Sequence, residues 1–232
     1  MTDQTNSKSP SPDGWKARPL PAYAIAVGVL IALVGGLVIG RATNSQLVPA
    51  DISVEAGFAR DMKVHHAQAV EMSMIVRDQT SDPGTRQLAY DIATSQQQQI
   101  GQMYGWLASW DLNQTSTRPS MSWMSMNGDH GGPHATPTSE TDTDKSRPSR
   151  DGIMPGMAAA AELSQLKKLR GRDAERLFLT MMVAHHQGGV EMANAALNLT
   201  DNRLVVPLAS SMVRSQSAEI EAMQNMLAER AA

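Results

Sequence analysis

Apolar side chains recur at helical spacing along two long stretches of this chain. In the first stretch, one face of the predicted helix carries Phe58, Met62, His65, Ala69, Met72 and Val76. An equivalent face follows 120 residues later, made of Phe178, Met182, His185, Gly189, Met192 and Ala196. Side chains three and four residues apart lie on the same side of a helix, so each face is the one we expect a helix to bury. The pattern predicts two amphipathic helices, each with a histidine pointing inward.

A second amphipathic helix follows each of these. In the first stretch its buried face is predicted to hold Ala89, Ile92, Gln96, Ile100, Met103 and Leu107. In the second stretch the corresponding face holds Ala209, Met212, Gln216, Ile220, Met223 and Leu227. Breaks are expected near residues 81–84 and 200–202, because their Asp, Asn, Pro and Gly residues favour turns and helix starts. Two helical hairpins are therefore predicted.

The two hairpins are copies of each other. Fifteen of the 52 positions from 56 to 107 are identical to the positions 120 residues later, where unrelated sequences would share only a few. Self-similarity at a fixed spacing indicates a repeated structural unit. Together the hairpins predict an all-α fold, a four-helix bundle with pseudo-twofold symmetry.

A separate apolar run, residues 21–40, precedes the repeats and contains no charged residue. Twenty such residues form a helix about 30 Å long, so the run predicts one N-terminal transmembrane helix. Lys8, Lys16 and Arg18 lie before it, whereas Arg41 is the only basic residue soon after it. The positive-inside rule then predicts a single-pass membrane protein with a cytoplasmic N-terminus and an extracytoplasmic, periplasmic main domain.

A cleaved signal peptide is the alternative interpretation of this run. Residues 48–50, Val-Pro-Ala, offer small side chains to a peptidase, but they lie far from the run. The run is also longer than the usual apolar core of a signal peptide, which favours a retained anchor. Either interpretation exports the domain. The segments before the repeats are expected to be a cytoplasmic tail (1–20), the anchor (21–40) and a linker (41–55). The first hairpin (56–110), a flexible connection (111–150) and the second hairpin (151–232) follow.

Composition narrows the chemistry that is available. The 232 residues include no cysteine, which excludes disulfides, a thiolate zinc site and a cysteine nucleophile. A formal net charge of -3 provides no basic surface, so nucleic acid is not an expected partner. The chain has sixteen methionines against two phenylalanines. Methionine fills irregular helical cores, but its thioether also binds Cu(I), so the positions of the methionines must decide between packing and binding.

The histidine pairs and their neighbouring methionines form a candidate metal site in each repeat. Imidazole and thioether groups one or two turns apart on one face can converge on an ion, and this combination suits copper as Cu(I) or Cu(II). In the alternative, the inward histidines are core residues hydrogen-bonded to the inward glutamines Gln96 and Gln216. The recurrence in both repeats favours metal binding. The candidate ligands are Met62, His65, His66, Met72, Met182, His185, His186 and Met192.

Several polar residues are expected to support these ligands. Gln96 and Gln216 would hold the tautomers of the histidine rings, as ligating histidines usually require. Glu71 and Glu191 lie roughly 120° around the helix from the inward histidines, so they have a supporting or a surface role.

The connection between the hairpins contains a second group of candidate ligands. It is rich in Ser, Thr, Pro and Gly, which predicts flexibility, yet it also gathers methionine and histidine. One interpretation is a tether with chance enrichment. The other is a mobile copper-capturing arm, which would work below the histidine pKa of about 6.5 because methionine binds without losing a proton. Its candidate ligands are Met121, Met124, Met126, His130, His134, Met154 and Met157.

The second repeat resembles the DUF305 family of exported, ferritin-like bundles with repeated His-His motifs. The residues that carry the resemblance are 178–193, Met154-Pro-Gly-Met157 and 216–220, and it extends from about 56 to 229. The resemblance implies a ferritin-like bundle and, from some members, extracytoplasmic copper binding. The first repeat departs from it, since Ala67 stands where the second has Gln187, so any supporting role of this glutamine is restricted to the second repeat.

The leading hypothesis is a copper-homeostasis protein that sequesters the ion, confers tolerance or delivers copper to a cuproprotein. It requires no catalysis. An alternative is an accessory subunit of a membrane complex, docked through Gly36 and Gly40 of the apolar run. A third is a metal-dependent oxidoreductase on a ferritin-like bundle. The chain lacks the carboxylate and Glu-x-x-His set of such enzymes, and it lacks His-Glu-x-x-His, so a binding protein is favoured over an enzyme.

Overall fold

The structure is a computed structural model that describes residues 22–43, 48–125 and 154–230. Its compact units are Met1–Val48 and Pro49–Ala232. Every regular element in the described ranges is helical, which confirms the all-α prediction. The elements are α1 (Ala22–Thr43), α2 (Val54–Gln79), α3 (Pro83–Ser109), the short 3-10 helix η1 (Ser122–Ser125), α4 (Ala160–Lys168), α5 (Gly171–Leu199) and α6 (Val205–Glu229).

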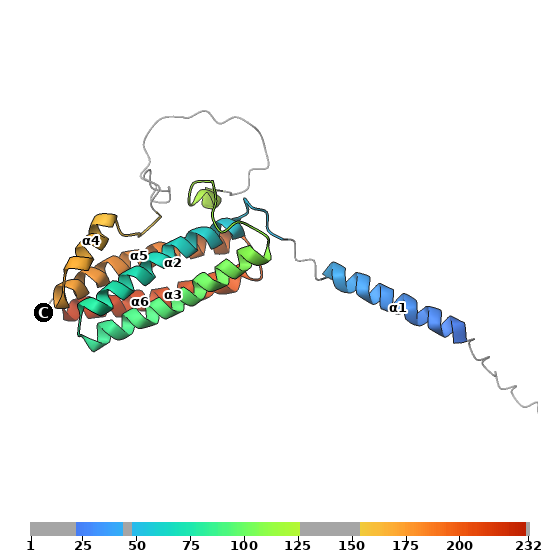
Figure 1. Cartoon of the computed structure of the whole chain (residues 1–232), viewed down its shortest axis with the longest axis horizontal. Helices are drawn as coiled ribbons and strands as arrows, with labels where there is room; N and C mark the ends of the chain where they lie inside the picture. Colours follow the sequence, from blue (N-terminus) through green and yellow to red (C-terminus); the bar gives the residue numbers. More distant parts are fainter. Residues whose placement is uncertain (1–21, 44–47, 126–153, 231–232) are drawn as a thin grey trace, which may run out of the picture. The chain divides into compact units, whose positions relative to one another are not determined.

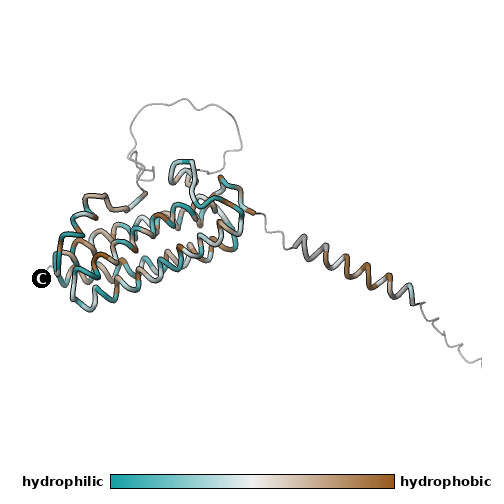
Figure 2. Tube along the Cα trace, viewed as in Figure 1, coloured by the Kyte–Doolittle hydropathy of each residue, from teal (hydrophilic) through white to brown (hydrophobic). Residues whose placement is uncertain are grey.

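Helix α1 is the regular element of the first unit. Figure 2 shows the hydrophobic character of this helix. Its described apolar side chains are exposed, including those of Val27, Val29, Leu30, Ile31, Leu33, Val34 and Leu37. Crossing a bilayer takes roughly 20 predominantly apolar residues. Within the part of the chain that the structure describes, no helix is long and apolar enough to do so. The predicted transmembrane helix over 21–40 is therefore unsupported.

The helix ends in the second unit follow from local sequence. Ser53 caps α2, because its hydroxyl accepts a hydrogen bond from the Ala56 amide at 3.2 Å. Asp82 caps α3 in the same way, accepting from the Thr85 amide at 2.7 Å, and Pro83 occupies the first turn. The breaks between α2 and α3 and between α5 and α6 fall where the turn residues predicted them.

The four long helices α2, α3, α5 and α6 pack into a bundle in which α2 contacts both α3 and α5, and α5 contacts α6 (Figure 1). The predicted inward faces are buried, except that Ile100, Ile220 and Leu227 are only partly so. The core has two apolar clusters. The first core cluster contains Phe58, Met62, Met192 and Met212, and the second contains Met72, Phe178, Met182 and Met223.

Helices α2 and α5 run antiparallel, and two reciprocal contacts show this. The Thr80 hydroxyl, after the end of α2, donates to the Glu175 carboxylate near the start of α5. The Thr200 hydroxyl, after the end of α5, donates to Glu55 near the start of α2. These contacts are equivalent under the 120-residue repeat, so they confirm that the two halves are related by pseudo-twofold symmetry.

The connection between the hairpins differs from the expected flexible segment over its described part, residues 111–125. Trp123 is only 2% exposed and packs edge-to-face on Phe58, with ring centroids 5.8 Å apart. Asp61 accepts hydrogen bonds from the Trp123 indole at 2.9 Å and from the Met121 amide at 2.7 Å. The buried Trp123 ring and the two hydrogen bonds to the Asp61 carboxylate therefore hold this segment on the bundle. The short helix α4 was also not predicted.

Candidate metal centre

Four histidines, His65, His66, His185 and His186, form a buried cluster where α2 and α5 cross. None is more than 1% exposed. The rings of His65 and His185 are closest, with centroids 3.8 Å apart, and each lies 6.3 to 6.4 Å from the ring of its sequence neighbour. Since successive helical residues are 100° apart, one histidine of each pair faces the opposite central helix while the next faces its own hairpin partner. We name these four residues the histidine cluster.

Three of the four rings are held through Nε2. His66 Nε2 lies 2.6 Å from the Gln99 side-chain oxygen, and the equivalent atom of His186 lies 2.6 Å from the Glu219 carboxylate. His65 Nε2 donates to the carbonyl oxygen of Pro155 at 3.0 Å. Sequence analysis missed all three acceptors. The repeat could have indicated Gln99 and Glu219, because they are equivalent positions and lie three residues after the inward glutamines.

The Nδ1 atoms of all four histidines are buried and have no hydrogen-bond partner. Where Nε2 carries the proton and donates it, Nδ1 holds a free lone pair. Buried polar atoms without a partner are uncommon and costly. Such lone pairs, on rings fixed through the opposite nitrogen, have the chemistry that a metal ligand needs.

Burial keeps three of these rings neutral. Desolvation lowers the pKa of His65 to about 4 and that of His66 to about 3, from an ordinary value of 6.5. Desolvation also lowers the pKa of His185 well below 6.5, and the neighbouring histidines act in the same direction. At neutral pH these three rings can therefore bind a cation without first releasing a proton.

The residues predicted to support the histidines do not hold their rings. Gln96 and Gln216 are buried, but each side-chain oxygen lacks a partner. Gly189 leaves room for the Gln216 side chain, because a Cβ there would lie 2.3 Å from the Gln216 oxygen. On the surface, Glu71 pairs with Lys167 at 2.9 Å, while Glu191 and Gln187 are exposed. The two glutamines are thus two further unpartnered groups in the core.

The candidate methionines divide between the two core clusters. On α2, His65 lies between Met62 of the first core cluster and Met72 of the second. On α5 the order is reversed, with Met182 in the second core cluster and Met192 in the first. The candidates of the connecting segments that pack in or against the first core cluster are Met121, Met124, Met154 and Met157. Met126, His130 and His134 lie outside the described residues.

Residues 154–158, which we name the strap, lie against the histidine cluster. Pro155 supplies the carbonyl that His65 contacts, and the side-chain amide of Gln68 binds both the N–H and the carbonyl of Ala158, at 2.7 and 2.9 Å. Gly156 has a φ of +72°, and a Cβ there would lie 2.1 Å from the Ala184 carbonyl oxygen. A Cβ on Gly188 would lie 2.0 Å from the Pro155 oxygen. The two glycines therefore permit the backbone of the strap to touch α5.

Among the described residues, no three or more histidine, aspartate or glutamate side chains are grouped so that they could hold a metal ion. A metal held here needs other donors beside imidazole. The methionine thioethers are the remaining soft donors in this core, and they prefer Cu(I).

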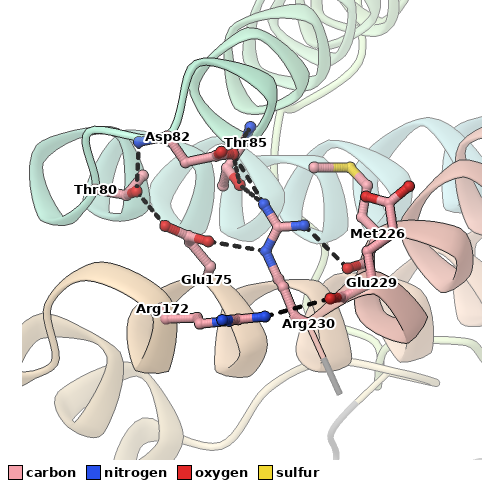
Figure 3. A network of polar contacts seen from close by, with 8 residues as sticks. All are labelled: Thr80, Asp82, Thr85, Arg172, Glu175, Met226, Glu229 and Arg230. Atoms are coloured by element: carbon pink, nitrogen blue, oxygen red, sulfur yellow. Dashed lines mark hydrogen bonds and ion pairs between the residues drawn. The ribbon is translucent and has the colours of Figure 1, made fainter. Parts of the chain in front are cut away.

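A pocket of about 800 Å³ lies away from the histidine cluster, between the α2–α3 turn, the start of α5 and the end of α6. Its charged groups pair with one another, as Figure 3 shows. Arg230 binds Glu175 and Asp82, each at 2.8 Å, and Arg172 donates to the Glu229 carbonyl. The network joins the two repeats at this end of the bundle.

Fold and site together define an all-helical bundle of two repeated hairpins with a histidine cluster between them. The chain belongs to the family described as Domain of unknown function (DUF305), whose family model matches residues 55–227. The resemblance noted from the sequence is thereby confirmed. No functionally curated protein matches the chain.

Three solved structures show how widely this fold is shared. A DUF305 protein from Streptomyces coelicolor, provisionally described as secreted, is 45% identical, with 79% of this chain and 97% of that chain covered and a TM-score of 0.66. A DUF305 fragment from Deinococcus radiodurans is 30% identical, and the match covers 76% of this chain and 96% of that fragment with a TM-score of 0.58. CopM in its Cu(II)-bound form is 25% identical, and the match covers 76% of this chain and 97% of the CopM chain with a TM-score of 0.52.

Proposed function

We propose that this protein is an exported copper-binding protein that sequesters the ion inside its helical bundle. One observation carries the proposal: His65, His66 and His186 are each held through Nε2, while Nδ1 stays buried without a partner. Metal-binding histidines adopt this arrangement, with one nitrogen on a protein acceptor and the other on the ion.

Copper is favoured over other metals by the surrounding donors. The described residues hold no group of three or more His, Asp or Glu side chains that could bind a metal ion, but methionines flank the histidines on both central helices. Imidazole binds copper in both oxidation states and thioether sulfur prefers Cu(I). The Cu(II)-bound form of the related CopM supports the same choice.

Sequestration is favoured over rapid transfer because the donors are buried. All four histidines are at most 1% exposed, and the strap covers His65. An ion inside would leave only when part of the bundle opens, which slows exchange. Export is supported by the description of the Streptomyces coelicolor relative as provisionally secreted.

Anaerobic titration of the full-length protein with Cu(I), against a competing chelator, tests this function. Replacing His66 and His186 by glutamine keeps a hydrogen-bonding side chain of similar size at both positions. We expect this double variant to lose more than about tenfold in Cu(I) affinity, a typical cost of disturbing a ligating histidine. Helix content measured by circular dichroism checks that the bundle remains folded.

The matched control replaces the other two histidines, His130 and His134, by alanine. This variant should keep the tight phase and lose only weaker binding, as expected if those residues belong to a capturing arm. Equal Cu(I) affinity in the wild type and in the His66→Gln, His186→Gln variant would contradict the proposed function.

A further inference from the structure

The strap covers the histidine cluster with a segment that lies outside the long helices. Of the three rings held through Nε2, two have their acceptors on α3 and α6, whereas the acceptor of His65 is the Pro155 carbonyl of the strap, at 3.0 Å. His65 therefore has a cover that can move while the four long helices stay packed. The centroid of its ring lies 3.8 Å from that of His185, and the Nδ1 atoms of both rings are buried without a partner. Movement of the strap would thus expose the centre of the cluster.

Equivalent positions of the two repeats hold and admit the strap. Gln68 on α2 and Gly188 on α5 are 120 residues apart, so they correspond under the repeat. The Gln68 amide binds the N–H and the carbonyl of Ala158, at 2.7 and 2.9 Å. A Cβ on Gly188 would lie 2.0 Å from the Pro155 oxygen, so a residue with a side chain there would push the strap away. One central helix therefore ties the strap down, and the other makes room for it at the same position.

The strap has the properties of a segment that opens locally. It has no ladder of helical hydrogen bonds, and such segments open at a lower free energy than the helices beneath them. It also carries Met154 and Met157, which pack in or against the first core cluster. Opening would therefore move two thioethers together with the cover of His65, and thioether sulfur is a donor that Cu(I) prefers.

We propose that the strap is the gate through which Cu(I) enters and leaves the histidine cluster, and that Gln68 sets how often it opens. The inference rests on the proposed function, because it names the route to the same site. Gln68 holds the strap closed in the free and in the loaded protein alike. Loss of its side chain therefore raises the population of the open state in both, which speeds entry and exit by the same factor and leaves the affinity unchanged.

Stopped-flow transfer of Cu(I) under anaerobic conditions, between the full-length protein and a chromogenic chelator, measures both rate constants. We expect Gln68→Ala to raise the association and the dissociation rate constant about tenfold each, because two hydrogen bonds to the strap are lost. The Cu(I) affinity should change by less than about threefold, since both rate constants rise together. Gln87→Ala, which removes only an exposed contact to Asp91, is the matched control and should leave both rate constants unchanged.

A second variant tests the gate from the opposite helix. Replacing Gly188 by alanine puts a Cβ against the Pro155 oxygen and displaces the strap, so we expect this variant to accelerate Cu(I) exchange as well. Gly101→Ala introduces the same methyl group into α3, where nothing lies within 4 Å of it, and should leave the exchange rate unchanged. Circular dichroism checks that each variant stays helical, and should one of the two strap variants unfold, the other decides.

The outcomes separate the gate from the proposed function. Wild-type rate constants in both Gln68→Ala and Gly188→Ala would overturn the gate and leave the proposed function intact, because the protein would still bind Cu(I). Faster dissociation without faster association would also overturn it, since the strap would then hold the bound ion in place without admitting it. If the wild type binds no Cu(I), the proposed function itself fails.

Discussion

At the scale of single residues, the histidine cluster combines neutral rings with free lone pairs. Burial lowers the pKa of His65 and of His66, so both rings are neutral at pH 7. The Nε2 atoms of both rings have protein acceptors, and both Nδ1 atoms are left without a partner. Each unpartnered nitrogen destabilises the metal-free protein, because it has lost its hydrogen bonds to water. An ion that binds these atoms removes the cost, so binding and folding are coupled.

The metal-free protein should lose stability as the pH falls. The folded pKa values of about 4 for His65 and about 3 for His66 lie below the ordinary 6.5, so the unfolded chain takes up protons that the folded chain refuses. The full stability is therefore present above about pH 6.5 and is lost as the pH falls toward the folded values. Near pH 5 the loss amounts to roughly 2 kcal/mol for each histidine. Urea denaturation between about pH 7.5 and 5 measures it.

The variant His66→Gln provides the control for this prediction. Its amide does not titrate, so the slope of unfolding free energy against pH should become distinctly shallower, whatever the variant's absolute stability. An unchanged slope would show that the acid sensitivity arises elsewhere.

At the scale of elements, the strap is the segment that covers the histidines from outside the four long helices. Two glycines, Gly156 and Gly188, let its backbone approach α5, and Gln68 of α2 holds its end with two hydrogen bonds. A short segment outside the helices opens more readily than the helices beneath it. The strap thus sits where local opening would expose His65.

Replacing Gln68 by alanine should loosen the strap without unfolding the bundle. The loss of two backbone hydrogen bonds favours local opening, and we expect amide exchange in residues 157–158 to accelerate about tenfold. Hydrogen–deuterium exchange measures this, with peptides of α6 as an internal reference. Gln87→Ala, which removes only an exposed contact to Asp91, is the matched control. Equal exchange in both variants would mean that Gln68 does not hold the strap.

At the scale of the whole molecule, the pseudo-twofold symmetry is broken at the two ends of the bundle. Glu175 and Glu55 receive equivalent threonine contacts, but among the described residues only Glu175 also binds an arginine, Arg230. The position equivalent to Arg230 in the first repeat is Trp110, which packs in the first core cluster. One end is therefore closed by an ionic network (Figure 3) and the other by an aromatic side chain.

Removing the Arg230 side chain should destabilise the bundle by about 2 to 3 kcal/mol. The carboxylate of Glu175, whose side chain is 9% exposed, would keep only its threonine partner, and the link to Asp82 would be lost. Urea denaturation of Arg230→Ala measures the effect. Arg172→Ala, at an exposed residue with a single contact to the Glu229 carbonyl, should change stability by less than about 0.5 kcal/mol. Similar losses in both variants would contradict the special role of Arg230.

The sequence by itself determined the four long helices, their breaks and most of their buried faces. Periodicity and turn chemistry are local properties, so the turn residues at 81–84 and the stripe through Met62 and His65 suffice to predict them. The repeat likewise predicted that two equivalent hairpins would bring two histidine pairs into one bundle.

Only the tertiary structure decided what each histidine contacts. Gln99 and Glu219 lie 33 residues from the histidines they hold, and Pro155 lies 90 residues from His65. Such partners depend on the rotation and approach of packed helices, which no local pattern specifies. The same reason explains why the inward glutamines were wrongly given the role of ring acceptors, and why the packing of Trp123 on Phe58 was missed.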